Sequence, residues 1–88
     1  MICKKCIVSG KVQGVWFRDT TRRKAQELGI TGHAVNLGNG DVEVIACGDA
    51  KSVDELTAWL WEGSQYAEVT DVQCQAISIE IPGSFLTG

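Results

Sequence analysis

"SGKVQGVWFRDTTRRKAQELG", residues 9–29, passes from a strand-like end into a helical pattern and carries the strongest structural signal in the chain. Apolar or small residues recur in it at the spacing of one helix face, at Phe17, Thr21, Ala25 and Leu28. Gly29 suits the left-handed residue that commonly follows a helix. The stretch therefore predicts a helix from residue 17 or 18 to residue 28, entered through a loop with two glycines.

Four β-leaning runs bounded by turn residues predict strands, at residues 3–9, 31–37, 41–48 and 71–81. The Gly-Asn-Gly at 38–40 is typical of a hairpin turn between the second and third strands. Asp49 is placed to cap a second helix, and Gly63 is placed to end it. The Ser-Phe-Leu at 84–86 predicts a short additional edge strand.

The order of these elements is β-α-β-β-α-β, which is the α+β, ferredoxin-like arrangement. We expect residues 1–88 to form a single domain, since a chain of this length builds one core. Right-handed crossovers then place both helices on one face of the sheet. The expected sheet is antiparallel, with strand order 4-1-3-2.

Charge and hydropathy limit the partners that this chain could have. The net charge is −3, whereas nucleic-acid binders normally carry a basic surplus, so no nucleic-acid partner is expected. Lysines interrupt the apolar residues near the N-terminus, so that region does not resemble a signal peptide. No apolar run approaches the roughly 18 residues that cross a bilayer. We therefore expect a cytoplasmic monomer with no membrane partner.

Four cysteines raise the question of a metal or redox site. Cys3 and Cys6 have C-x-x-C spacing, but a zinc site would need a second close pair. On a strand these two residues point to opposite faces, so they would not chelate one ion. The sequence therefore predicts no metal site.

The expected topology brings the start of the first strand near the end of the third. Cys3 would then approach Cys47 on the face away from the helices, and a disulfide between them is a hypothesis. A reducing cytosol argues against it. Cys6 and Cys74 are interpreted as ordinary core positions.

The loop before the first helix has the parts of an anion site. Gly10 and Gly14 let the backbone bend so that several N–H groups converge beside a helix N-terminus. Arg18 adds a permanently charged fork that matches phosphate or carboxylate oxygens. The P-loop pattern is absent, and Val12 stands where a cysteine phosphatase needs its nucleophile. On the residues alone, an anion cradle and an ordinary turn with a solvated arginine both stay open.

"GKVQGVWFR" at 10–18 resembles the signature G-x-V-Q-G-V-x-F-R of acylphosphatases. "TGHAVNLGNGDVEVIACG" at 31–48 is similar to that family's second motif, and the resemblance extends from about Cys3 to the end of the fourth strand. It implies the same ferredoxin-like fold. It also implies hydrolysis of the carboxyl–phosphate bond of small acyl phosphates, which releases inorganic phosphate without a metal or another cofactor.

The resemblance also implies the site residues. Arg18 would bind the substrate phosphate, and Asn36 would position the attacking water. Backbone N–H groups of one loop would share the phosphate with Arg18, those of Gln13, Gly14, Val15, Trp16, Phe17 and Arg18 itself.

Two positions depart from the family pattern, and a third falls where that pattern is variable. His33 stands where the family usually has an aromatic residue, and Val35 where a basic residue is common. His33 is expected to be a partly exposed strand residue and not a catalyst. Trp16 falls at the variable position of the first motif, where it either lines the mouth of the site or packs.

Other functions share this scaffold and stay open as alternatives. One is a non-catalytic module that binds phosphate or another anion. Another is a carbamoyl-phosphate-handling domain like that of hydrogenase-maturation enzymes. RNA-recognition domains share the element order, but they need aromatic residues on the first and third strands, and those strands have none here.

Overall fold

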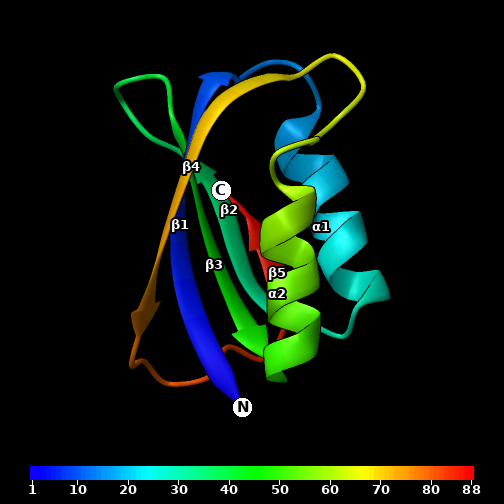
Figure 1. The fold of residues 1–88 in the computed structure, drawn as a ribbon, viewed down its shortest axis with the longest axis vertical. Coiled ribbons are helices and arrows are strands. Elements are labelled where there is room, and N and C mark those ends of the chain that lie inside the picture. Colours follow the sequence, from blue (N-terminus) through cyan, green and yellow to red (C-terminus); the bar gives the residue numbers. More distant parts are fainter.

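The computed structural model describes residues 1–88 and has two helices packed on one five-stranded sheet (Figure 1). In chain order the elements are β1 (Ile2–Lys11), α1 (Phe17–Glu27), β2 (Thr31–Asn36), β3 (Val42–Gly48), α2 (Ala50–Trp59), β4 (Glu68–Ile77) and β5 (Phe85–Thr87). This order confirms the predicted β-α-β-β-α-β arrangement and the short strand after it. Neither helix has the length and apolar content that a membrane crossing requires.

The strands lie in the order β4-β1-β3-β2-β5. β1 is antiparallel to both β3 and β4, and β2 is antiparallel to β3, which confirms the predicted order 4-1-3-2. β5 pairs in parallel with β2, so the sheet is mixed and the prediction of an antiparallel sheet is wrong at this edge. Figure 1 shows why: the segment after β4 runs past the lower end of the sheet and enters β5 beside β2.

β4 begins and ends earlier than the predicted residues 71–81. Its first residues continue the pairing with β1, where Glu68 lies opposite Lys11 beyond an irregularity at Ser9 and Gly10. At its other end Ile77 lies opposite Cys3, close to the start of β1. The apolar alternation beyond Ile77 therefore has no strand to pair with, and periodicity alone does not reveal that limit.

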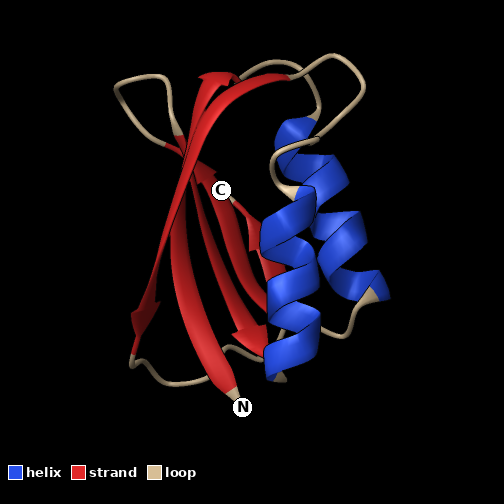
Figure 2. Cartoon of the chain, in the orientation of Figure 1, coloured by secondary structure: helices blue, strands red, loops and turns tan.

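The core lies between the sheet and the two helices, which cover one face (Figure 2). α1 buries the predicted face through Phe17, Thr21 and Ala25. The sheet contributes apolar side chains at alternate positions, Cys6, Val8, Ala34, Val42, Val44 and Ala46. Asp49 caps α2 as predicted, because its carboxylate accepts the backbone N–H of Ser52 at 3.0 Å. This hydrogen bond lowers the pKa of Asp49.

The face of the sheet away from the helices carries a small ionic cluster. Glu43 on β3 lies 2.7 Å from His33 Nε2 on β2 and 3.5 Å from Lys5 Nζ on β1. The hydrogen bond with His33 is the main cause of a lowered pKa of Glu43, and the positive charge of Lys5 adds to it. His33 is a partly exposed strand residue, as expected, and Glu43 is its partner in the structure.

Glu43→Gln is expected to lower the free energy of unfolding at pH 7 by about 1 kcal/mol or less, because it removes the charge that His33 and Lys5 favour. A carboxyl whose pKa is lowered in the folded state stabilises the fold above its unfolded pKa of about 4.3. That stabilisation is lost as the pH falls through the folded pKa. Urea unfolding at pH 7, 5 and 3 should show the difference between variant and wild type shrinking toward zero. A constant difference would contradict the assignment.

Two disulfides cross-link neighbouring strands, Cys3–Cys47 between β1 and β3 and Cys6–Cys74 between β1 and β4. Each joins residues that lie directly opposite in the ladder. The first confirms the hypothesised pair. The interpretation of Cys6 and Cys74 as ordinary core positions holds for Cys6, which lies in the buried core. It is wrong for Cys74, which is exposed on edge strand β4, and it missed the bond between the two.

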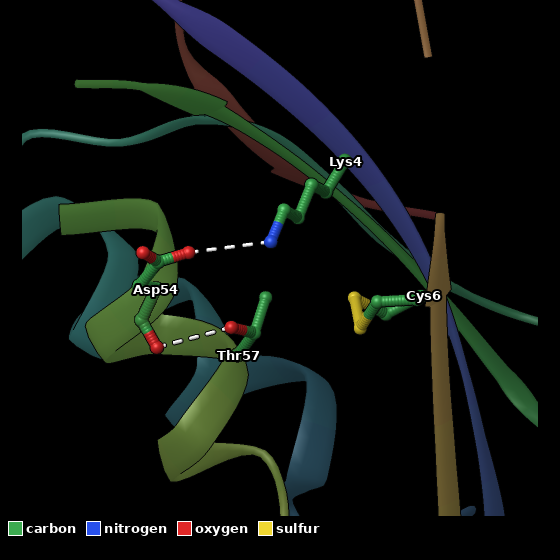
Figure 3. Close-up of a disulfide and its surroundings, with 5 residues drawn as sticks. Lys4, Cys6, Asp54 and Thr57 are labelled. Atoms are coloured by element: carbon green, nitrogen blue, oxygen red, sulfur yellow. Dashed lines mark hydrogen bonds and ion pairs between the residues drawn. A yellow bond between two sulfur atoms is a disulfide. The ribbon is translucent and has the colours of Figure 1, made fainter. Parts of the chain in front are cut away.

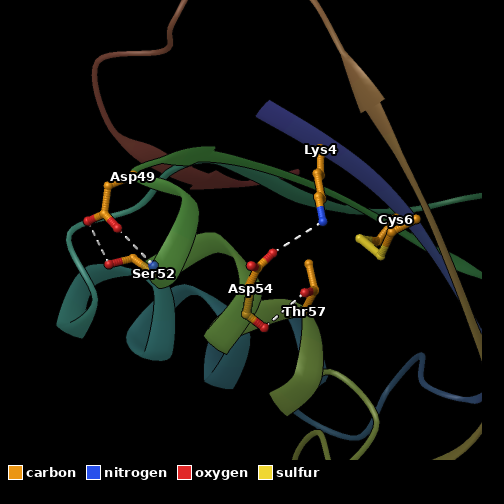
Figure 4. A network of polar contacts seen from close by, with 7 residues as sticks. Lys4, Cys6, Asp49, Ser52, Asp54 and Thr57 are labelled. Atoms are coloured by element: carbon orange, nitrogen blue, oxygen red, sulfur yellow. Dashed lines mark hydrogen bonds and ion pairs between the residues drawn. A yellow bond between two sulfur atoms is a disulfide. The ribbon is translucent and has the colours of Figure 1, made fainter. Parts of the chain in front are cut away.

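The Cys6–Cys74 disulfide lies on the face of the sheet that carries α2 (Figure 3). Beside it, Lys4 of β1 reaches α2 and places its ammonium group 3.2 Å from the carboxylate of Asp54. Figure 4 shows this ion pair together with the Asp49–Ser52 cap that starts the same helix. Cys3 and Cys6 lie on opposite faces of β1, and each is bonded to a cysteine of a different strand.

Candidate active site

The loop between β1 and α1 turns through two left-handed residues. Gly14 has a φ of 73° and Trp16 a φ of 64°, on either side of Val15. Glycine adopts this conformation freely, whereas a large side chain such as that of Trp16 rarely does. A left-handed residue within a loop turns successive backbone N–H groups toward the same side. The N–H groups then form a concavity suited to an anion.

α1 begins directly after this turn. Trp16, the residue before the helix, makes no side-chain hydrogen bond to the first turn. Its carbonyl oxygen accepts from the backbone N–H and the hydroxyl of Thr20, at 3.0 and 2.8 Å. The first N–H groups of a helix point out of its N-terminus and carry the positive end of its dipole. This end of α1 therefore favours a negatively charged ligand.

A cavity of about 300 Å³ opens at this end of α1. It is lined by the loop, the first turn of α1 and the end of β5, through Val12, Gly14, Trp16, Phe17, Arg18, Asp19 and Thr87. Gly14, Trp16, Phe17 and Arg18 are members of the phosphate-binding loop expected from the sequence. The remaining members, Gln13 and Val15, belong to the same loop but lie outside the lining of the cavity.

Asp19, the acidic residue that lines the cavity, is paired with two arginines of its own helix. One carboxylate oxygen of Asp19 lies 2.5 Å from Arg22 Nη2, and the other lies 3.0 Å from Arg23 Nε. Arg18 makes no ion pair of this kind. The guanidinium of Arg18 is therefore the positive charge that an anion in the cavity would meet.

Arg18 donates a hydrogen bond to the backbone oxygen of Gly88. The backbone N–H of Gly88 in turn donates to the carbonyl oxygen of Ala34 on β2, at 3.3 Å. These contacts join α1 to β2 through the residue that follows β5. They also show that the Arg18 guanidinium donates to an oxygen atom, and a phosphate would present acceptors of the same kind.

Gln13 ties the loop to the β2–β3 hairpin. Its side-chain amide donates to the carbonyl oxygens of Leu37 and Asp41, at 2.8 and 2.9 Å. The resemblance assigned only the backbone N–H of Gln13 to the site, so this positioning role was missed. The contact holds the end of β2 beside the cradle, and Figure 1 shows that hairpin at the same end of the molecule as the start of α1.

A second support comes from the loop after α2. Ser64 is buried, and its hydroxyl donates to the carbonyl oxygen of Val15 at 2.6 Å. At Gly63 a Cβ atom would lie 2.6 Å from the ring of Phe17, so only glycine fits there without a shift. No local pattern reveals the Ser64 contact, because the two bonded residues are 49 positions apart.

Asn36 is the last residue of β2 and is exposed. It follows buried Ala34 by two positions, so its side chain points to the face that carries the helices. It does not line the cavity. His33 and Val35 have the opposite parity and point to the other face, where Val35 lies beside Gly88, the residue that Arg18 contacts.

These features make one end of a ferredoxin-like domain suited to a negatively charged ligand. Uncapped helical N–H groups, a turned loop and the Arg18 guanidinium meet at one cavity. No cluster of three or more histidine, cysteine, aspartate or glutamate residues is arranged to hold a metal ion.

Comparison with known proteins shows which family this chain belongs to. The acylphosphatase family model matches residues 4–86. The chain is 51% identical over 78 residues to an acylphosphatase of Coxiella burnetii, which covers 89% of this chain and 82% of that relative. It is 46% identical to an acylphosphatase of Xanthomonas euvesicatoria pv. vesicatoria over the full length of both chains. The crystal structure of an acylphosphatase from Bacillus subtilis aligns with a TM-score of 0.96 at 29% identity, covering 100% of this chain and 99% of that chain.

The chain therefore belongs to the acylphosphatase family. It is an enzyme, and its reaction is the hydrolysis of an acyl phosphate to a carboxylate and inorganic phosphate. The predicted family and activity are confirmed.

Proposed function

We propose that Arg18 and the backbone N–H groups of residues 13–18 hold the phosphoryl group, and that Asn36 orients the attacking water. The observation that carries this assignment is the cavity in which Arg18, the left-handed turn and the uncapped start of α1 meet. Phosphoryl transfer passes through a loose transition state whose charge is spread over the equatorial oxygens. A cradle that is already formed stabilises that charge without reorganising.

The leaving group needs little help from the protein. Water attacks phosphorus, the bond between phosphorus and the carboxyl oxygen breaks, and the carboxylate leaves with the bonding electrons. In this mechanism the phosphate displaces the Gly88 oxygen from the Arg18 guanidinium, because a phosphate offers two oxygens to the planar fork. The catalytic effect then comes mainly from positioning and from charge.

Asn36 acts by hydrogen bonding in this proposal. A side-chain amide does not ionise at neutral pH, so it orients the water and does not take its proton. We assign the proton to a phosphate oxygen of the substrate. Support for the position of Asn36 comes from the Gln13 hydrogen bonds that hold the following residue, Leu37, beside the loop.

The enzyme is proposed to act on small acyl phosphates as a cytoplasmic monomer that needs no metal, nucleic acid or membrane. Arg18 supplies the charge that a metal ion would otherwise supply. In the cytoplasm the two cysteine pairs would be exposed to a reducing thiol pool, so the stability of the enzyme would depend on their redox state.

The direct test is hydrolysis of benzoyl phosphate by the purified enzyme with a chelator present. We expect turnover that is unchanged by the chelator and inhibited by inorganic phosphate. Phosphate that protects the protein from unfolding without any turnover would instead indicate a non-catalytic binding module. Loss of activity on chelation would overturn the metal-free mechanism.

Asn36→Ala is expected to lower kcat for benzoyl phosphate on the order of a hundredfold while changing KM little, because the oriented water is needed only for the chemical step. The matched control is Asn39→Ala, an exposed asparagine in the same hairpin that hydrogen-bonds only within its turn. The control should keep the wild-type kcat. Equal kcat values for the two variants would remove Asn36 from the mechanism.

A further inference from the structure

Trp16 is an unusual residue for its position. Its side chain is 71% exposed, although its backbone adopts the left-handed conformation that bulky residues rarely take. Glycine would occupy this position without strain. Strained residues of this kind concentrate at functional sites, and here the strained residue lines the cavity beside Arg18.

The fold itself makes little use of the indole. Trp16 is absent from the buried core, and it makes no side-chain hydrogen bond to cap α1. The sequence left open whether this side chain packs or lines the mouth of the site, and its exposure excludes the packing role. A large apolar side chain held in solvent at a cavity is available to a ligand.

The lining of the cavity divides into two parts. The polar part is built from Arg18, Thr87 and the loop backbone, and Asp19 is already paired within its helix. The apolar residues are Val12, Trp16 and Phe17, but Val12 and Phe17 are each only 1% exposed. The apolar surface that a ligand can reach is therefore almost entirely that of Trp16.

We propose that the Trp16 indole binds the acyl group of the substrate and makes the enzyme prefer aromatic or bulky apolar acyl phosphates over acetyl phosphate. This inference rests on the proposed placement of the phosphoryl group at Arg18. With the phosphoryl group held there, an acyl group directed along the same cavity meets the indole. Stacking of an aromatic ring on another aromatic ring adds to the gain from apolar burial, whereas a methyl group has little surface to contribute.

The test compares kcat/KM for benzoyl phosphate and acetyl phosphate in the wild type and in three variants. Trp16→Gly removes the indole and suits the left-handed backbone. Trp16→Asn also removes the indole, and asparagine tolerates that backbone while keeping a Cβ atom. Trp16→Phe keeps an aromatic ring. The matched control is Trp61→Ala, because Trp61 is also an exposed tryptophan but does not line the cavity.

The decisive quantity is the ratio of the two kcat/KM values. Any change in the loop backbone affects both substrates through their common phosphoryl group, so it cancels in the ratio. We expect the benzoyl-to-acetyl ratio to fall about tenfold in Trp16→Gly and Trp16→Asn. The ratio should stay near the wild-type value in Trp16→Phe and in Trp61→Ala.

Two failures are distinguishable. If the wild type hydrolyses neither substrate, the phosphoryl placement at Arg18 fails and this inference fails with it. If the wild type hydrolyses both and the ratio in Trp16→Gly stays within twofold of the wild type, only the acyl-binding role of Trp16 is overturned. An equal fall in Trp61→Ala would also overturn it, because the effect would then not be local to the cavity.

Discussion

Arg18→Ala is expected to lower kcat/KM for benzoyl phosphate by about a hundredfold or more, which is the usual effect of removing a group that stabilises transition-state charge. Arg18 is the only cationic residue that lines the cavity. The nearby Arg22 and Arg23 are both paired with Asp19, so they are not free to replace it. Initial rates over a range of substrate concentrations, measured with a chelator present, give kcat and KM separately.

The reason for so large an effect is the geometry of the guanidinium. Its planar fork can share two oxygens of the transferring phosphoryl group, and its charge is permanent. Arg18→Lys keeps the charge and loses the fork, so we expect an intermediate rate. The ordering of wild type, lysine variant and alanine variant separates the contribution of charge from that of bidentate geometry.

Arg18→Ala is also expected to fold, since the protein contact it loses is one hydrogen bond to the Gly88 backbone oxygen at a partly exposed position. Thermal unfolding should therefore show a Tm close to that of the wild type. Lys24→Ala, which removes one positive charge from the last turn of the same helix, is the control for net charge. An Arg18→Ala variant that keeps a third or more of the wild-type kcat/KM would contradict the mechanism.

Local sequence patterns predicted most of the fold because each element carries its own signal. The spacing from Phe17 to Leu28, the glycine-rich turn at 38–40 and the Asp49 cap all act within a few residues. Two right-handed crossovers then leave few topologies for the sheet. The direction of β5 could not be predicted from local patterns, because it depends on the path of the segment after β4.

The candidate site was only partly predictable for the same reason. Gly14 and Arg18 indicated an anion cradle on physical grounds, with an ordinary turn and a solvated arginine still open as the alternative. Asn36 was assigned only by resemblance to a family motif. The contacts of Gln13 with Leu37 and of Ser64 with Val15 join segments that are far apart in the sequence. Such contacts follow from the assembled fold, so sequence periodicity cannot reveal them.

The second disulfide shows how much depends on strand register. Cys6 lies opposite Cys74 only because β1 and β4 pair in one particular register, with an irregularity at Ser9 and Gly10. A shift of one residue would move the Cys74 side chain to the other face of the sheet. The sequence gives no local signal for this register, which is why the pair was interpreted as two separate core residues.

Loss of a disulfide is expected to have the largest effect on stability. The bridges close segments with sequence separations of 44 and 68 residues. Loop-closure entropy gives each of them about 4 kcal/mol, as an upper estimate that strain and residual structure reduce. Domains of this size are stable by only about 5–15 kcal/mol. Cys3→Ala/Cys47→Ala and Cys6→Ala/Cys74→Ser should therefore each lower Tm by roughly 10 °C or more.

The two bridges are expected to differ in how readily they are reduced. Cys3 and Cys47 are both buried, at 6% and 1% exposure, whereas Cys74 is exposed on edge strand β4. Because thiol–disulfide exchange requires a thiolate to reach one sulfur atom, the Cys6–Cys74 bridge should open first. Timed reduction of the native protein, followed by alkylation and peptide mass spectrometry, should label Cys74 before Cys3 or Cys47. Labelling of Cys47 before Cys74 would contradict this order. Four alkylated thiols in protein kept under oxidising conditions would contradict the two bridges themselves.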